Sequence, residues 1–390
     1  MTTIPRRYIL ALACTLFFSL GLMTAALGPL LPTLADQTGV DLAAVGVVFT
    51  GIFFGALAAQ IVSGPLGDRW GQVWVVLIGA GLIMVGTLLI SFSTTLPLLL
   101  AMAVLAGFGH GSVDLGGNVW IAQLFNHRSV SAVNLLNFFF GLGATSGAAV
   151  AGLAMRWWGT GLPALWLSSA LDALAILGLI LARGLFKNPP ERMASAATVT
   201  KNLIYTTPVV WAFGLLILIY VGIENGVGGW TTTFMQQASD VQAAQAALIT
   251  SGFWLMLTAG RMVSATLGMR LAAHRILIAT LIGTSLAGGL LILGHGNLIL
   301  STVAILLMGF CFGPVYPTMI AITTSVFPKD AGKAAGVVAS MGSVGGMVLP
   351  WLLGIVLAKL GISAFTFFAL TANLCMAGLA LSLYKRIKIP

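Results

Sequence analysis

Ser63-Gly64-Pro65-Leu66-Gly67-Asp68-Arg69 has a relative further along the chain, Ser264-Ala265-Thr266-Leu267-Gly268-Met269-Arg270. The two segments lie 201 positions apart (63 and 264), and glycines such as Gly143 and Gly345 keep nearly the same offset (202). A near-constant offset over most of a chain indicates an internal duplication. In a membrane protein, two related halves suggest a transporter whose substrate site lies between them.

The composition indicates a membrane protein. Of the 390 residues, 59% are hydrophobic and 7% are charged, whereas soluble domains carry about 25% charged residues. Apolar runs of about 20 residues, each long enough to cross a bilayer, recur along the chain. The predicted helices are 8–31, 42–63, 74–94, 97–121, 130–153, 162–182, 208–231, 243–264, 276–294, 298–323, 334–357 and 363–384. The expected fold is all-α, with twelve transmembrane helices in two pseudo-symmetric six-helix bundles.

Basic residues collect on one side of this predicted topology. Those on that side are Arg6, Arg7, Arg69, Arg128, Arg183, Lys187, Arg192, Lys201, Arg270, Arg275, Lys329, Lys333, Lys385, Arg386 and Lys388. Only Arg156 and Lys359 fall on the other side, and Arg261 lies inside the eighth helix. The positive-inside rule therefore predicts that both termini are cytoplasmic. The net charge of +9 reflects this topology, and we expect no nucleic-acid partner.

Three segments follow from the topology: an N-terminal bundle over 1–183, a cytoplasmic linker over 184–206 and a C-terminal bundle over 207–390. The first helix is the repeat partner of the seventh, so we expect a membrane helix rather than a cleaved signal peptide. The three cysteines lie in predicted helices and show no disulfide or metal spacing. No Gly-Lys-Ser/Thr phosphate loop is present. We therefore expect no metal, no cofactor, no use of ATP and no enzymatic activity.

The segment Gly64–Gln72 resembles the signature loop of the major facilitator superfamily. That loop runs Gly, three residues, Asp-Arg, one residue and Gly, and Gln72 and Val73 replace its usual basic pair here. The resemblance implies the major facilitator fold. It also implies that Asp68 helps to hold the cytoplasmic side closed. A carboxylate at a helix N-terminus would be favoured by the helix dipole, and the alternative is a simple topology anchor. The predicted gating residues are Gly64, Asp68, Arg69 and Gly71.

Four further segments resemble the fucose–galactose–glucose permease branch of that superfamily. They are Gly107–Asn118, Asn134–Ala144, Tyr220–Trp230 and Gly313–Thr318. Two features depart from the branch. Asn137 stands where the branch often has His, and Met23-Thr24 replaces the proton-linked carboxylate that the fucose type carries in its first helix.

In the first half, the strongest candidate for a substrate- or proton-binding residue is Asp114, a carboxylate in an apolar helix. Such a group is costly in a bilayer unless it is paired or hydrated. His110, Asp114 and Asn118 are spaced i, i+4, i+8 and share one helix face. The resemblance also places an acid at Asp114 and an Asn at Asn118. Substrate or proton binding is therefore predicted, with a helix-packing hydrogen bond as the alternative.

In the second half, Glu224 is the candidate carboxylate, one turn after Tyr220. Nearby glycines predict a break in this helix, and Trp230 beyond them could stack on a sugar or lie in the interfacial belt. Tyr316 is the repeat counterpart of Asp114. Asn134 and Asn137 offer donors and acceptors, with interhelical hydrogen bonding as an equal alternative. Asp172 and Asn373 are interpreted as structural.

We therefore expect a secondary transporter in the cell membrane, the inner membrane in a Gram-negative bacterium, that imports a small polar solute such as a monosaccharide by alternating access. Asp114 and Glu224 are the predicted proton carriers, with Na+ as the alternative coupling ion, and the lipid-embedded protein is expected to act as a monomer. One rival is a proton-coupled exporter, although Gly147 lacks the following Pro of the exporter signature. A second rival is a non-transporting solute receptor.

Overall fold

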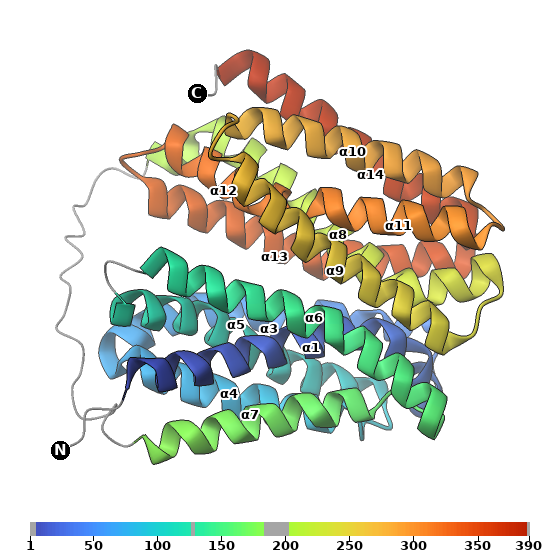
Figure 1. The fold of residues 1–390 in the computed structure, drawn as a ribbon, viewed down its shortest axis with the longest axis horizontal. Coiled ribbons are helices and arrows are strands. Elements are labelled where there is room, and N and C mark those ends of the chain that lie inside the picture. The colour runs from blue at the N-terminus through green and yellow to red at the C-terminus, as the bar shows by residue number, and fades with distance from the viewer. Residues whose placement is uncertain (1–4, 126–128, 183–202, 388–390) are drawn as a thin grey trace. The chain divides into compact units, whose positions relative to one another are not determined.

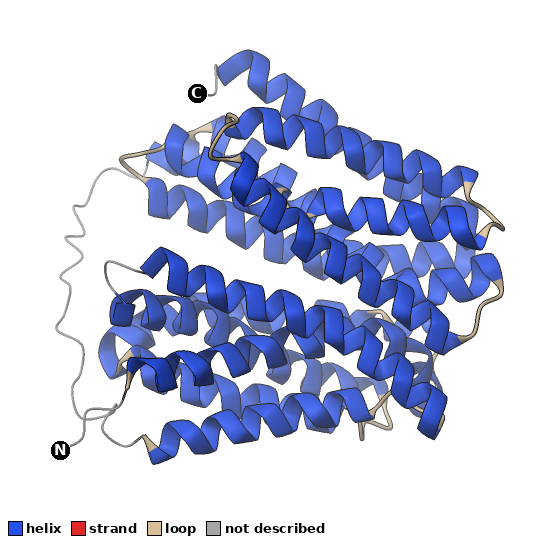
Figure 2. Ribbon diagram, in the orientation of Figure 1, coloured by secondary structure: helices blue, strands red, loops and turns tan. Residues whose placement is uncertain are grey.

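The computed structural model describes residues 5–125, 129–182 and 203–387, and within them the chain is helical with no strand (Figure 2). Helices suit this composition because a lipid-facing backbone must satisfy its hydrogen bonds internally. The longer helices are labelled in Figure 1. The elements in chain order are α1 (Arg6–Thr38), α2 (Leu42–Val45), α3 (Val47–Trp70), α4 (Gln72–Ile90), α5 (Leu96–Phe125), α6 (Ser129–Trp158), α7 (Pro163–Leu181), η3 (Leu203–Thr206), α8 (Pro208–Ser239), α9 (Ala243–Leu267), α10 (Ala273–Leu293), α11 (Leu298–Phe312), α12 (Val315–Val326), α13 (Ala331–Ile355), η4 (Val356–Leu360) and α14 (Gly361–Ile387).

Eleven helical stretches among the described residues are long and apolar enough to cross a membrane. The last of them, Ala331–Tyr384, is 54 residues long, and a crossing needs about 20. Gly361, at φ 83°, separates α13 and η4 from α14 within this stretch. The predicted fold class is confirmed, with the last two predicted crossings joined in one apolar stretch.

The chain forms two compact units. The first contains residues 1–41 and 47–197, and the second contains 42–46 and 198–390. Helices pair in the same way inside each unit: α1 packs on α6 as α8 packs on α13, and α7 packs on α1 and α4 as α14 packs on α8 and α10. The shared pairing is what an internal duplication produces. Most of the predicted linker 184–206 lies outside the described residues.

Glycines bring these helix pairs into backbone contact. A Cβ on Gly143 of α6 would collide with the carbonyl oxygen of Phe18 on α1, and a Cβ on Gly345 of α13 would collide with that of Leu218 on α8. The two contacts are related by the repeat. Small residues at helix interfaces let backbones approach closely and pack through van der Waals contact.

Two local expectations from the sequence are wrong. The Gly64–Gln72 segment is mostly helical, since α3 continues to Trp70 and Gly71, at φ 92°, alone separates it from α4. The predicted break near Gly226 and Gly228 is absent, because α8 runs unbroken from Pro208 to Ser239. Those two glycines instead make room for Leu353 of α13 and Trp254 of α9.

We predict that Gly143→Ala lowers the thermal stability of the purified protein. Overpacking of a close contact typically costs about 1–3 kcal/mol. Gly81→Ala on α4 is the control, because a Cβ at Gly81 meets nothing within 4 Å and alanine is favoured in helices. Thermal unfolding in detergent should show a lower midpoint for Gly143→Ala only. Equal effects of the two substitutions would contradict the backbone-contact account.

Candidate functional site

Asp114 and Asn118 contact each other on α5, as their spacing predicts. The amide nitrogen of Asn118 lies 3.2 Å from Oδ1 of Asp114 and 2.9 Å from its backbone oxygen. One turn earlier, the ring of His110 packs edge-on against Phe140 of α6, with centroids 6.3 Å apart. We call His110, Asp114 and Asn118 the Asp114 cluster.

Two polar atoms of the Asp114 cluster are buried without a hydrogen-bond partner among the described residues. They are Oδ1 of Asn118 and Nδ1 of His110. A buried polar atom without a partner costs roughly 1–3 kcal/mol, so a ligand that supplies the missing hydrogen bond gains in affinity. The cluster can therefore both accept and, depending on the histidine tautomer, donate hydrogen bonds to a solute.

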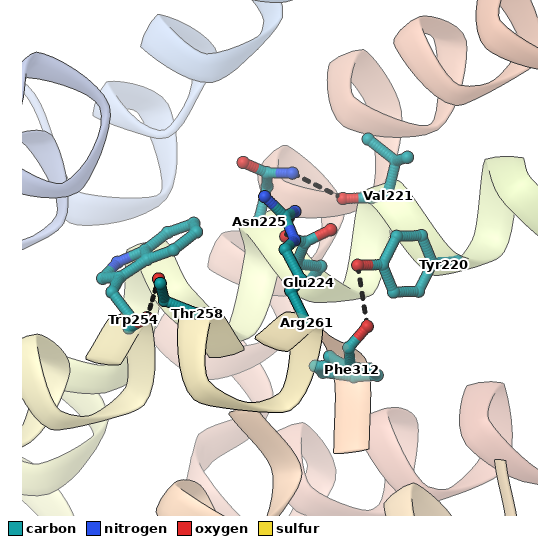
Figure 3. Close-up of polar contacts among 8 residues, drawn as sticks. All are labelled: Tyr220, Val221, Glu224, Asn225, Trp254, Thr258, Arg261 and Phe312. Atoms are coloured by element: carbon teal, nitrogen blue, oxygen red, sulfur yellow. Dashed lines mark hydrogen bonds and ion pairs between the residues drawn. The ribbon is translucent and has the colours of Figure 1, made fainter. Parts of the chain in front are cut away.

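In the second unit, Glu224 of α8 forms an ion pair with Arg261 of α9 (Figure 3). The guanidinium nitrogen Nη2 lies 3.6 Å from Oε1 of the carboxylate, and their side chains are 29% and 8% exposed, respectively. This separation exceeds that of a hydrogen bond. From the sequence, Arg261 was located inside a helix but was assigned no role. Its position in an apolar helix already indicated a carboxylate partner, because an arginine within a membrane segment needs an opposite charge.

Tyr220 lies one turn before Glu224 and is fully buried. Its hydroxyl donates to the carbonyl oxygen of Phe312, 3.0 Å away, at the end of α11 (Figure 3). Its ring packs edge-on against that of Phe312. Gly313-Pro314 separates α11 from α12, because proline cannot donate a backbone hydrogen bond within a helix. Tyr220 thus ties the Glu224 region to the discontinuity that precedes Tyr316.

Trp254, Thr258 and Arg261 follow one face of α9, at i, i+4 and i+7. Thr258 donates to the backbone oxygen of Trp254, 2.9 Å away. Nε1 of Trp254 and Nε of Arg261 are buried and have no hydrogen-bond partner among the described residues. Glu224 and Arg261, with Tyr220 beside them and Trp254 two turns from Arg261 on the same face of α9, form the Glu224 cluster. Among the described residues this cluster holds two donors without partners.

The structure does not bring Trp230 into the Glu224 cluster. Trp230 is fully buried, its indole nitrogen donates to the Pro350 carbonyl oxygen 2.7 Å away, and its ring fills the space that side chains at Gly46 and Gly354 would occupy. The contact with a sugar stays a prediction. In this structure Trp230 packs within the second unit.

The remaining predicted binding residues are more accessible. Asn134 and Asn137 of α6 are exposed, and Asn137 donates to the backbone oxygen of Val133, 3.0 Å away. Tyr316 of α12 is half-buried. Their substrate roles stay predictions.

The predicted gating residues lie at the junction of α3 and α4. Asp68 and Arg69 are exposed in the last turn of α3, beyond the half-buried Gly64, and Gly71 supplies the turn. The helix-dipole reason given for Asp68 is therefore wrong, because the end of α3 favours a cation such as Arg69 rather than an anion. A gating role for this segment stays a prediction.

Comparison with known proteins identifies the family of this chain. The family model of the Major Facilitator Superfamily matches residues 13–247 and 226–389. The chain therefore belongs to the major facilitator superfamily, whose members are transporters, and is a multi-pass membrane protein.

Relatives agree with the resemblance to the sugar-permease branch. Human sodium-dependent glucose transporter 1 is 24% identical over 378 residues, covering 89% of this chain and 73% of that protein. Among solved structures, a D-xylose–proton symporter has a TM-score of 0.80 at 14% identity, covering 95% of this chain and 96% of the symporter. The nucleoside transporter NupG has a TM-score of 0.76 at 15% identity, covering 97% of this chain and 98% of NupG. At these identities the two structures show the fold alone.

We predict that Glu224→Gln destabilises the protein and that adding Arg261→Gln restores part of the loss. Breaking a buried ion pair lowers the free energy of unfolding by roughly 3–5 kcal/mol. Because Arg261 is partly exposed, we expect a loss of about 3 kcal/mol or less. The exposed pair Lys333–Asp330, 3.3 Å apart, is the control, since Asp330→Asn should cost less than about 1 kcal/mol. Additive single-variant losses in a thermal-unfolding double-mutant cycle would contradict the pairing.

Proposed function

We propose that this protein is a secondary transporter that moves a small hydroxylated solute, such as a monosaccharide, inward by alternating access and together with protons. The observation that carries this proposal is the set of buried polar atoms without partners in both clusters. Asn118 Oδ1, Trp254 Nε1 and Arg261 Nε offer one acceptor and two donors. A sugar hydroxyl is both a donor and an acceptor, so it can pair with the acceptor in the first cluster or with the donors in the second.

Coupling follows from the charges of the Glu224 cluster. Glu224 and Arg261 together are neutral while the carboxylate is ionised. Protonation of Glu224 removes the negative charge and leaves Arg261 as an uncompensated cation, which is costly away from water. Solute oxygens that accept from Arg261 would offset part of that cost, so proton binding and solute binding favour each other.

Asp114 gives the first unit a second carboxylate for coupling. Its hydrogen-bond partner, Asn118, is neutral, and the described residues contain no ion pair to Asp114. Asp114 is half-buried in an apolar helix, where a carboxylate without a counter-charge is costly, so it is a candidate proton carrier. The human relative is described as sodium-dependent, and Na+ is the alternative ion, because carboxylate and amide oxygens also suit a hard cation.

The rivals differ from this proposal in direction or in the absence of transport. An exporter of the same superfamily would use the same fold with the opposite net flux. A receptor would bind the solute without moving it. Uptake into vesicles of known orientation separates the three.

We predict that a thermal-shift screen of the purified protein finds ligands among monosaccharides, because a ligand that binds the folded state raises apparent stability. Asn118→Ala should then weaken the best ligand about tenfold, since the loss of one hydrogen bond in a buried site costs roughly 1–3 kcal/mol. Gln237→Ala, at an exposed position, is the control. Ligand titration measures both dissociation constants. Stabilisation by hydrophobic drugs alone, or equal constants for the two variants, would contradict the proposal.

A further inference from the structure

Asp172 is a buried carboxyl group that plays no part in the proposed transport clusters. It lies in the middle of α7 and is 0% exposed. Neither of its carboxyl oxygens has a hydrogen bond of ordinary geometry among the described residues. A charged carboxylate in this position would be very costly, because it would lack water, a cation and hydrogen bonds.

The surroundings of Asp172 are polar but uncharged. One turn earlier on α7, the hydroxyl of Ser168 lies 2.8 Å from the hydroxyl of Ser19 on α1. Each hydroxyl can also donate to the backbone oxygen of the other serine, at 3.0 and 3.2 Å. The Ser19 hydroxyl is close enough to Asp172 to interact with its carboxyl group, but its hydrogen-bond partners lie on Ser168.

The neighbouring helices place no cation beside Asp172. The helices packed on α7 are α1, α4 and α6. α4 has no titratable residue, and the only charged residue among the described side chains of α6 is Arg156, near its end. Within the α1 span the titratable side chains are Tyr8, which donates to the Gly178 oxygen, and Cys14, which is buried. The charged residues of α1 lie in its end turns: Arg6, Arg7 and Asp36.

The second unit holds a buried polar side chain close to the equivalent position. In this part of the chain the repeat offset is 202 (143 and 345), so the counterpart of Asp172 is Leu374, and Asn373 lies one residue before it. Asn373 is also 0% exposed, and its amide nitrogen donates to the backbone oxygen of Thr284 on α10, 3.2 Å away. A protonated carboxyl group has nearly the shape of such an amide and is likewise a neutral donor.

We propose that Asp172 is a proton-binding site within the first unit, separate from Asp114 and Glu224, and that its carboxyl group holds a proton while α1 and α7 are packed together. The proton comes from water and forms an O–H bond on a carboxylate oxygen, which leaves a neutral group inside the interface. It returns to water when the two helices separate enough to hydrate the carboxylate. The site therefore links the protonation of the first unit to the packing of α1 on α7.

Infrared spectroscopy of the full-length protein in lipid tests this site without any solute. At neutral pH the wild type should show the C=O stretch of a protonated carboxylic acid that shifts in deuterium oxide. Asp172→Asn should remove that band, whereas Asp114→Asn and Glu224→Gln should leave it in place. Asn373→Asp, which places an acid at another fully buried helix position, should add a second band of this kind.

Asp172→Asn should fold, because an amide is neutral and has nearly the shape of a protonated carboxyl group. If it does not, Asp172→Glu keeps the acid and should move the band to a new frequency. A wild-type spectrum without the band, or a band unchanged in both Asp172 variants, would overturn the proposal. Neither outcome bears on solute binding by the other two clusters.

Discussion

The ion pair between Glu224 and Arg261 limits the states that the second unit can adopt, because neither charge is stable alone away from water. The 3.6 Å separation keeps the two groups electrostatically paired, and Nε of Arg261 has no hydrogen-bond partner among the described residues. Any event that removes the charge of Glu224 must therefore be accompanied by a new partner or by hydration for Arg261. This requirement gives the second unit a physical reason to couple proton binding to solute binding.

The rest of each unit acts as a rigid support for these groups. Glycines such as Gly143 and Gly345 bring paired helices into backbone contact, which fixes how each helix is rotated. The hydrogen bond from Tyr220 to Phe312 joins α8 to the discontinuity between α11 and α12. A carboxylate such as Glu224 is thus held in place by its neighbours, while the unused polar atoms around it are left for a ligand.

Much of the fold could be predicted from the sequence, because hydrophobic length, basic-residue asymmetry and the repeat offset are properties of the chain itself. The Asp114–Asn118 contact was also predictable, since both residues lie on one helix. Arg261 was visible as a charge in an apolar helix, but its pairing with Glu224 depends on how α8 and α9 are rotated. Trp230 was ambiguous for a related reason: only the packing shows that Gly46 and Gly354 enclose its ring. Asp172 resembled a structural polar residue until its burial and its lack of hydrogen bonds were known.

The central claim is that Glu224 couples solute movement to an ion gradient, and accumulation of a bound monosaccharide in proteoliposomes tests it most directly. With an imposed pH gradient, the wild type should concentrate the sugar, and a sodium gradient alone should not. Glu224→Gln should only equilibrate the sugar across the membrane. Accumulation by Glu224→Gln equal to that of the wild type, or no accumulation by the wild type under a proton gradient, would contradict the account.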